Sequence, residues 1–428
     1  MRKVVVQKRA VNDMTKLFLF ISIWAELWAG IGGEAMQSAC LGFFALAAIS
    51  ALRLERVLSP RPVLLELSLF GAAILSVLTT SLRGDYVLCA YSALFLITMV
   101  SISIIARTLT LEEILEISSI VIFTGFLSFF ILDFRDLVTA LSVVIGHKGL
   151  VRFTPFGMHP NLVGLTFGGG SILLARMAVL AKTHAARILF GISAIGAVAF
   201  VLAGSARSSL LALSVAIFYG YFAAARIFPR LYRRSALIAV VLSALGITIG
   251  TNKIVAYLGR ILELESKTRG IGSGGTGRVQ LWLHGISQIF VNPMRFAFGS
   301  GLRSSDSEQG MSGFSTENSY ITLALDLGVP LASLIIGCLC FCLYLVVAKY
   351  PGTEKNAQTN RVVLGSFFIF VLVESIFNRY LVAIGNAVSL IFLLGVVSVS
   401  VRGELAKRRV ELSERRRDLH ASYSPQRE

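Results

Sequence analysis

The chain has 428 residues, of which 55% are hydrophobic and only 15% are charged. Soluble globular proteins carry about a quarter charged residues, so this composition excludes an ordinary soluble domain. The net charge of +16 does not indicate nucleic-acid binding, because the basic residues cluster in short loops on one side of the predicted membrane spans. We therefore expect a single all-α, polytopic membrane domain over residues 1–428.

Apolar runs of about 20 residues, long enough to cross a hydrocarbon core of roughly 30 Å, recur along the chain. They predict about 12 transmembrane helices, at 14–33, 36–52, 62–82, 86–106, 113–133, 160–181, 186–203, 207–225, 235–251, 318–348, 361–378 and 382–401. The first follows a basic segment but is interpreted as a retained helix, because a second span comes at once. In the long tenth span, Gly328-Val-Pro330 is the expected place for a kink.

The distribution of basic residues orients this layout. An even number of spans puts both termini on one side, and that side then holds most of the basic short loops and the basic tail 402–428. The positive-inside rule makes this side cytoplasmic, with the tail touching anionic lipid. The two longer loops, 134–159 and 252–317, are then both on the outer face.

The longest break between apolar runs is 252–317, and it contains polar and glycine-rich motifs that a simple linker does not need. Its motifs are Gly275-Thr-Gly-Arg278-Val-Gln-Leu-Trp282, Asn292-Pro293, Gly299-Ser-Gly301 and, at its end, Ser315-Thr-Glu317-Asn318-Ser-Tyr320. We predict that this loop is the catalytic face and that the apolar helices hold it at the bilayer surface.

Two arginines are candidate anion ligands on the outer face. Arg207 begins a span and is flanked by serines; it is either an interfacial arginine reaching headgroups or a phosphate ligand beside a helix start. Arg278 and Trp282 are four residues apart and share one face of a helix. Trp282 is either an interfacial aromatic residue or a platform for stacking a sugar.

Several acidic residues lie in or beside apolar runs. Glu317 stands at the start of the tenth span, where it is either a favourable partner of the helix dipole or a general base for a hydroxyl. Asp326 must face protein or a water-filled cavity, because a carboxylate facing lipid is costly. Glu26 and Glu374 are deeper in their spans and keep a transporter hypothesis open.

Four segments, taken in order, resemble the O-antigen ligase and Wzy-type polysaccharide polymerase superfamily, including the ExoQ-like exopolysaccharide polymerases. They are Gly157-Met-His-Pro-Asn161, Ser205-Ala-Arg207-Ser, the run from Gly277-Arg278 through Trp282 to Gly301, and Thr316-Glu317-Asn318-Ser-Tyr-Ile321 followed by Asp326-Leu-Gly328. The resemblance covers most of the chain. It implies a GT-C-like helical fold in the bacterial inner membrane, with the 252–317 loop in the periplasm.

The resemblance also implies a membrane glycosyltransferase whose substrate is an oligosaccharide linked to undecaprenyl diphosphate. The family's two arginines that hold the diphosphate leaving group correspond to Arg207 and Arg278, and no metal or other cofactor is expected. We assign substrate binding to Trp282, Asn318, Asn161 and Arg152. Membrane lipid, a chain-length regulator and a flippase are the expected partners.

One departure from the family pattern concerns the residue expected to act as the general base. Where the family pattern has histidine before asparagine, this chain has Glu317. A carboxylate can accept the same proton from a sugar hydroxyl, so Glu317 is the predicted base and His159 the alternative. The predicted function is a polysaccharide polymerase that builds exopolysaccharide or O-antigen. The alternatives are an O-antigen ligase acting on the lipid A core and a flippase or other transporter.

Overall fold

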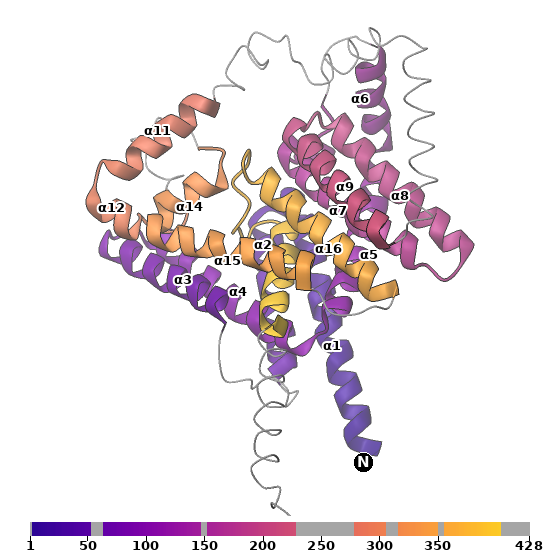
Figure 1. Cartoon of the computed structure of the whole chain (residues 1–428), viewed down its shortest axis with the longest axis horizontal. Helices are drawn as coiled ribbons and strands as arrows, with labels where there is room; N and C mark the ends of the chain where they lie inside the picture. The colour runs from indigo at the N-terminus through magenta and orange to yellow at the C-terminus, as the bar shows by residue number, and fades with distance from the viewer. Residues whose placement is uncertain are drawn as a thin grey trace, which may run out of the picture.

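The computed structural model describes residues 2–52, 63–146, 152–227, 278–304, 316–349 and 355–403, and every regular element in these ranges is helical (Figure 1). The elements are α1 (Arg2–Leu27), α2 (Ala29–Leu52), α3 (Leu64–Leu82), α4 (Tyr86–Thr108), α5 (Leu111–Leu132), α6 (Phe134–Gly146), η2 (Pro155–Gly157), α7 (Pro160–Leu180), α8 (His184–Ala203), α9 (Arg207–Ile227), α11 (Arg278–Phe290), α12 (Pro293–Phe298), α14 (Ser319–Leu327), α15 (Val329–Lys349), α16 (Lys355–Glu374) and a last apolar helix, Ala387–Gly403. The predicted all-α class is confirmed for this part of the chain.

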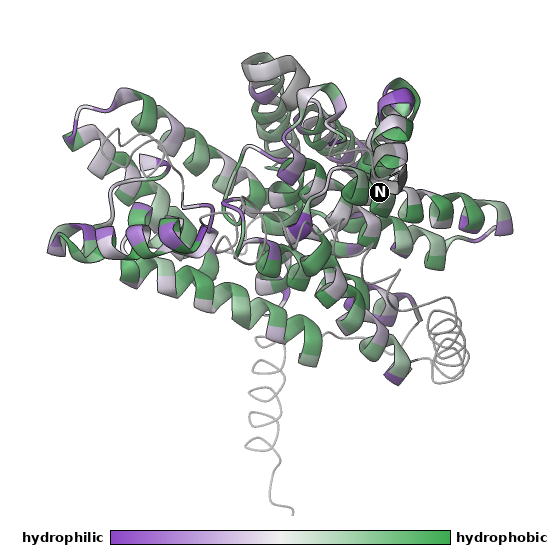
Figure 2. Ribbon diagram, turned by 90° about the horizontal axis from the view of Figure 1, so that it is seen from above, coloured by the Kyte–Doolittle hydropathy of each residue, from purple (hydrophilic) through white to green (hydrophobic). Residues whose placement is uncertain are grey.

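Within the described ranges, nine helices are long and apolar enough to cross a membrane. They are α3, α4, α5, α7, α8, α9, α15, α16 and the part of α2 from Ala35 onward. Figure 2 shows these long helices largely in green, the colour of hydrophobic residues. Large apolar side chains such as Ile195 (73% exposed) and Phe218 (66% exposed) cover their outward faces, which suits contact with lipid rather than water. The protein is therefore a polytopic membrane protein.

The predicted spans and the observed helices differ at both ends of the chain. α1 ends at Leu27 and is not among the nine, but helix resumes at Ala29 and breaks at Gly33 (φ 56°, ψ −140°), the predicted limit of the first span. The last predicted span, 382–401, begins as a helix only at Ala387. Part of the predicted loop 134–159 is helical, as α6. The predicted span at 235–251 lies outside the described residues, as do 252–277, 305–315 and the tail from 404.

α7 is a deeply buried helix that contacts α5, α8, α9 and α16. Its small residues allow this close approach, as is common between membrane helices. A Cβ atom on Gly168 would lie 2.6 Å from the Phe370 ring of α16, and one on Gly164 would lie 2.2 Å from the Ser209 hydroxyl of α9. The first turns of α7 and α9 and the last turn of α16 are therefore held together at one end of the bundle.

The predicted break in the tenth span is confirmed at Gly328. This residue has φ +78° and separates α14 from α15. A Cβ atom there would lie 2.5 Å from the carbonyl oxygen of Ala297, at the end of α12. Gly299 (φ +69°) packs in the same way against the backbone of Asp326, and the Ser300 amide donates to the Leu325 carbonyl at 3.0 Å. Only glycine fits both conditions, so these two residues lock α12 against the end of α14.

Candidate functional site

The side chain of Glu374, the last residue of α16, is 1% exposed and accepts three hydrogen bonds. Its Oε1 atom accepts from the Ser208 hydroxyl at 3.2 Å, from the Ser209 hydroxyl at 2.8 Å and from the Asn378 amide. Its Oε2 atom has no hydrogen-bond partner among the described residues. This carboxylate therefore ties the start of α9 to the end of α16.

Asn378 is fully buried and extends the same network to two more helices. Its Oδ1 atom accepts from the Asn161 amide of α7 at 2.8 Å, and its backbone carbonyl accepts from the Ser319 hydroxyl of α14 at 2.6 Å. Asn378 thus joins the starts of α7, α9 and α14 to the end of α16. These are the polar segments that the sequence predicted to share one membrane face.

Charged residues from four segments act electrostatically on His159, the N-cap residue of α7. Desolvation lowers the pKa of His159; Glu317 acts to raise it, and the positive charges of Arg152, Arg379 and Arg278 lower it further. The residue as a whole is still exposed, so solvent screens part of this effect. Three arginines and one glutamate are therefore close enough to act on a single imidazole.

The hydrogen bonding of His159 bears on which residue is the base. Its Nδ1 atom accepts the backbone amide of Asn161 at 3.3 Å. In the neutral ring the proton is then on Nε2, which can only donate. A lowered pKa also keeps the ring neutral at pH 7. This arrangement favours Glu317 over His159 as an acceptor of a proton.

Glu317 has φ +49°, a left-handed conformation that is uncommon for a residue with a side chain. Its neighbours hold it there: the Asn318 side chain accepts the amides of Tyr320 at 2.9 Å and Ile321 at 3.1 Å, and Thr316 is buried. Strained backbone of this kind costs about 1–3 kcal/mol and is concentrated at functional sites. Asn318, predicted to bind substrate, is observed as the N-cap of α14.

The other predicted site residues lie around this network. Arg207 is the first residue of α9, directly before the two serines that bind Glu374. Arg278 begins α11 and attracts the Glu374 carboxylate. Trp282, one turn further along α11, has its ring centre 6.2 Å from that of Phe377, next to Asn378, and its buried indole nitrogen has no partner among the described residues.

The sequence patterns did not indicate the segment Asn378-Arg379-Tyr380, which contributes three polar residues to the site. Burial raises the pKa of Tyr380 to about 12; the charges of Glu317 and Glu374 act in the same direction and Arg379 in the opposite one, so the phenol stays protonated at neutral pH. The available signal was a run of polar residues between two apolar spans.

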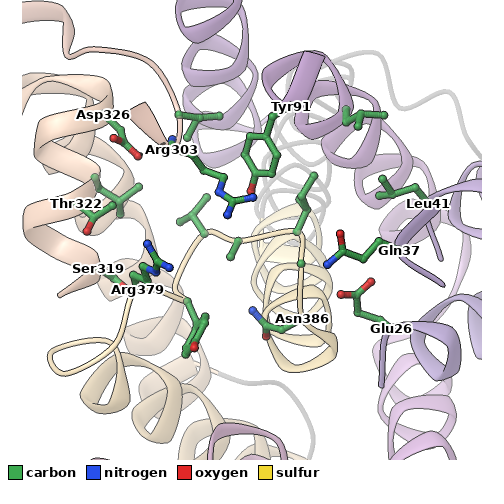
Figure 3. Close-up of a pocket in the computed structure, with 18 residues that line it drawn as sticks. Glu26, Gln37, Leu41, Tyr91, Arg303, Ser319, Thr322, Asp326, Arg379 and Asn386 are labelled. Atoms are coloured by element: carbon green, nitrogen blue, oxygen red, sulfur yellow. Dashed lines mark hydrogen bonds between the residues drawn. The ribbon is translucent and has the colours of Figure 1, made fainter. Parts of the chain in front are cut away.

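A cavity of about 260 Å³ adjoins this cluster (Figure 3). Arg379 and Tyr380 line it and so belong to both regions. Figure 3 shows Arg379, Ser319, Thr322 and Asp326 on one side of the cavity, Glu26 and Gln37 on the other, and Arg303 beside Tyr91 between them. The site as a whole consists of a charged cluster and a neighbouring polar cavity.

Comparisons with known proteins do not identify the chain. No model of a known protein family matches it, and a search of curated proteins finds no match. The resemblance to the O-antigen ligase and polymerase superfamily therefore stays a prediction that depends on the four sequence segments.

Proposed function

We propose that the protein is a membrane glycosyltransferase that polymerises lipid-linked oligosaccharide repeat units into exopolysaccharide or O-antigen. The observation that carries the proposal is the convergence of Arg152, Arg278 and Arg379 with Glu317 around His159, at one end of an apolar helical bundle. Cations suit a diphosphate leaving group, and one carboxylate suits the proton of a hydroxyl acceptor. The GT-C-like fold, about 12 spans, the bacterial inner membrane and the cytoplasmic termini are parts of the same proposal.

In the proposed reaction, the bond between the anomeric carbon of the growing glycan and its phosphate oxygen breaks. A hydroxyl on the non-reducing end of a new lipid-linked repeat unit forms the replacement bond, and its proton passes to Glu317. The electron pair of the broken bond leaves with undecaprenyl diphosphate. Preorganised positive groups such as Arg278 stabilise the charge that develops on the diphosphate, an effect that reaches about 10²–10³ in rate for a single donor.

The first test is the size distribution of surface glycan in a strain that lacks the protein. Single repeat units in place of long chains, accumulated on the outer face, support the polymerase. Long chains that remain on the lipid carrier and are missing from lipid A would instead identify a ligase. Repeat units stranded on the cytoplasmic side would identify a flippase, the alternative that the buried carboxylates Glu26 and Glu374 keep open.

The second test addresses the residues. Arg278→Ala should abolish long polymer while the protein remains in the membrane at normal levels. Arg135→Ala is the matched control, because Arg135 is exposed on α6 and is not among the residues that act on His159. Undiminished polymer in an Arg278→Ala, Arg207→Ala double variant would contradict the proposed diphosphate site.

A further inference from the structure

The cavity beside the charged cluster contains two buried polar atoms that have no hydrogen-bond partner among the described residues. They are Oε1 of Glu26, on α1, and Nδ2 of Asn386, directly before the last helix. The two residues are only 5% and 3% exposed. A buried polar group without a partner is unfavourable, so two such groups lining one cavity point to a ligand that satisfies both.

The chemistry of the two atoms is complementary. The Asn386 Oδ1 atom accepts the backbone amide of Ser389 at 2.7 Å, which fixes the orientation of the amide and leaves Nδ2 as a donor. Glu26 offers a carboxylate oxygen as an acceptor. A hydroxyl group both donates and accepts, so adjacent hydroxyls on a sugar ring match this pair. Gln37 lies beside Glu26 in Figure 3 and adds a second amide.

The charges of the cavity disfavour a metal cation. Arg303 and Arg379 both line it, against the carboxylates of Glu26 and Asp326. Asp326 is already engaged, because its Oδ2 atom accepts the Arg303 amide at 2.8 Å and its Oδ1 atom accepts the Ser304 hydroxyl at 3.3 Å. A polar ligand without positive charge fits this balanced set of groups.

Size and position restrict the ligand further. A cavity of about 260 Å³ is slightly smaller than the usual small-molecule site, which begins at about 300 Å³, so it suits a sugar unit rather than a lipid chain. Ser319, which lines the cavity, is two residues after Glu317. Tyr380 also lines the cavity, and the negative charge of Glu317 contributes to raising its pKa. A sugar in the cavity would therefore have Glu317 close by.

We propose that this cavity is the acceptor subsite, where Glu26 and Asn386 hold the terminal sugar of the incoming repeat unit by its hydroxyls. This inference depends on the proposed function for the role of the sugar as acceptor. The binding of the saccharide itself can be tested without turnover.

The experiment measures binding of the repeat-unit oligosaccharide, released from its lipid carrier by mild acid, to the full-length protein in lipid nanodiscs by titration calorimetry. Glu26→Gln keeps the shape and removes the charge, and Asn386→Asp keeps the bond to Ser389 but replaces the donor by an acceptor. Each should weaken binding by roughly 10–100-fold, as expected for loss of a hydrogen bond to a charged or oriented group. Ser398→Ala is the control, because its buried hydroxyl also has no partner among the described residues but does not line the cavity.

Equal affinity of the wild type, both cavity variants and the control would overturn the subsite. Weakened binding in the two cavity variants alone supports it, and thermal unfolding of each variant verifies that the fold is intact. A failure of the proposed function can be distinguished from a failure of the subsite. Arg278→Ala should remove polymer if the protein is a transferase. The same variant should bind the released oligosaccharide as the wild type does, because that oligosaccharide carries no diphosphate.

Discussion

Replacing Glu374 by alanine tests whether its carboxylate holds the site together. The change removes the acceptor of three hydrogen bonds, from Ser208, Ser209 and Asn378. Each buried donor left without an acceptor costs about 1–3 kcal/mol. Asn378 keeps its 3.2 Å bond to the Ser208 hydroxyl, and removal of a buried charge returns part of the desolvation cost. We therefore expect a net loss of about 2–4 kcal/mol.

The assay is thermal unfolding of the protein purified in one detergent, at a fixed scan rate because unfolding of a large membrane protein is irreversible. The alanine variant should unfold at a temperature lower by roughly 2–4 °C. Glu374→Gln is the matched control, since its carbonyl oxygen still accepts the three bonds. It should stay within about 1 kcal/mol of the wild type.

Two results would refute this reasoning. An alanine variant as stable as the wild type would show that the network does not hold the four helix ends together. A glutamine variant as unstable as the alanine variant would show that the charge of Glu374, and its attraction to Arg278, matters more than the hydrogen bonds.

Four further predictions follow from the geometry. In NMR titrations, the pKa of His159 should lie below its ordinary value of 6.5. Arg278→Ala should raise that pKa by removing a positive charge, and Glu317→Gln should lower it by removing the opposing negative charge. A pKa that responds to neither change would show that these residues do not lie near His159. Because its folded pKa is lowered, His159 should reduce stability as pH falls below about 6.5, a slope that His159→Gln should remove in unfolding measured across pH. Glu317→Gln should shorten or abolish polymer while Glu317→Asp keeps part of it, and normal chain length in the glutamine variant would remove Glu317 from the mechanism. Gly328→Ala should lower the unfolding temperature, because its Cβ atom would lie 2.5 Å from the Ala297 carbonyl; an unchanged temperature would mean that the backbone relaxes freely there.

Hydropathy and glycine patterns predicted the parts of the fold that depend on local sequence. Apolar length placed most of the long helices within a few residues, and the Gly328-Val-Pro330 sequence correctly located the break between α14 and α15. The predicted boundary between the first two spans coincides with a kink at Gly33 (φ 56°, ψ −140°), whereas the one-residue turn at Trp28, after the end of α1, was not predicted. Likewise, hydropathy does not show that 378–386 is non-helical, since an apolar run looks the same whether or not it is a helix.

Contacts between segments that are distant in the chain could not be predicted from the sequence. Nothing in the run around Asn378 indicates that it bonds Asn161 and Ser319, which are far away in the chain. The sequence also did not show that Asn318 is a helix cap, because asparagine suits both capping and sugar binding. Arg278 was recognisable from its motif, but its proximity to Glu374 required the tertiary structure.

The segment Asn378-Arg379-Tyr380 explains how the two regions of the site keep a fixed relation. Asn378 is bonded to four helix ends, so the two residues that follow it start from a rigid anchor. The charge of Arg379 lowers the pKa of His159 in the charged cluster, and Arg379 also lines the cavity. Tyr380 lines the cavity too, and the charge of Glu317 contributes to raising its pKa. Bond transfer between two bound glycans requires reacting atoms about 3–3.5 Å apart, and a misplacement of about 1 Å costs on the order of 100-fold in rate. If the proposed transfer holds, a single anchored segment that contacts both the charged cluster and the cavity meets this requirement without a moving part, and the buried network at Asn378 would fix the distance between the two proposed substrates.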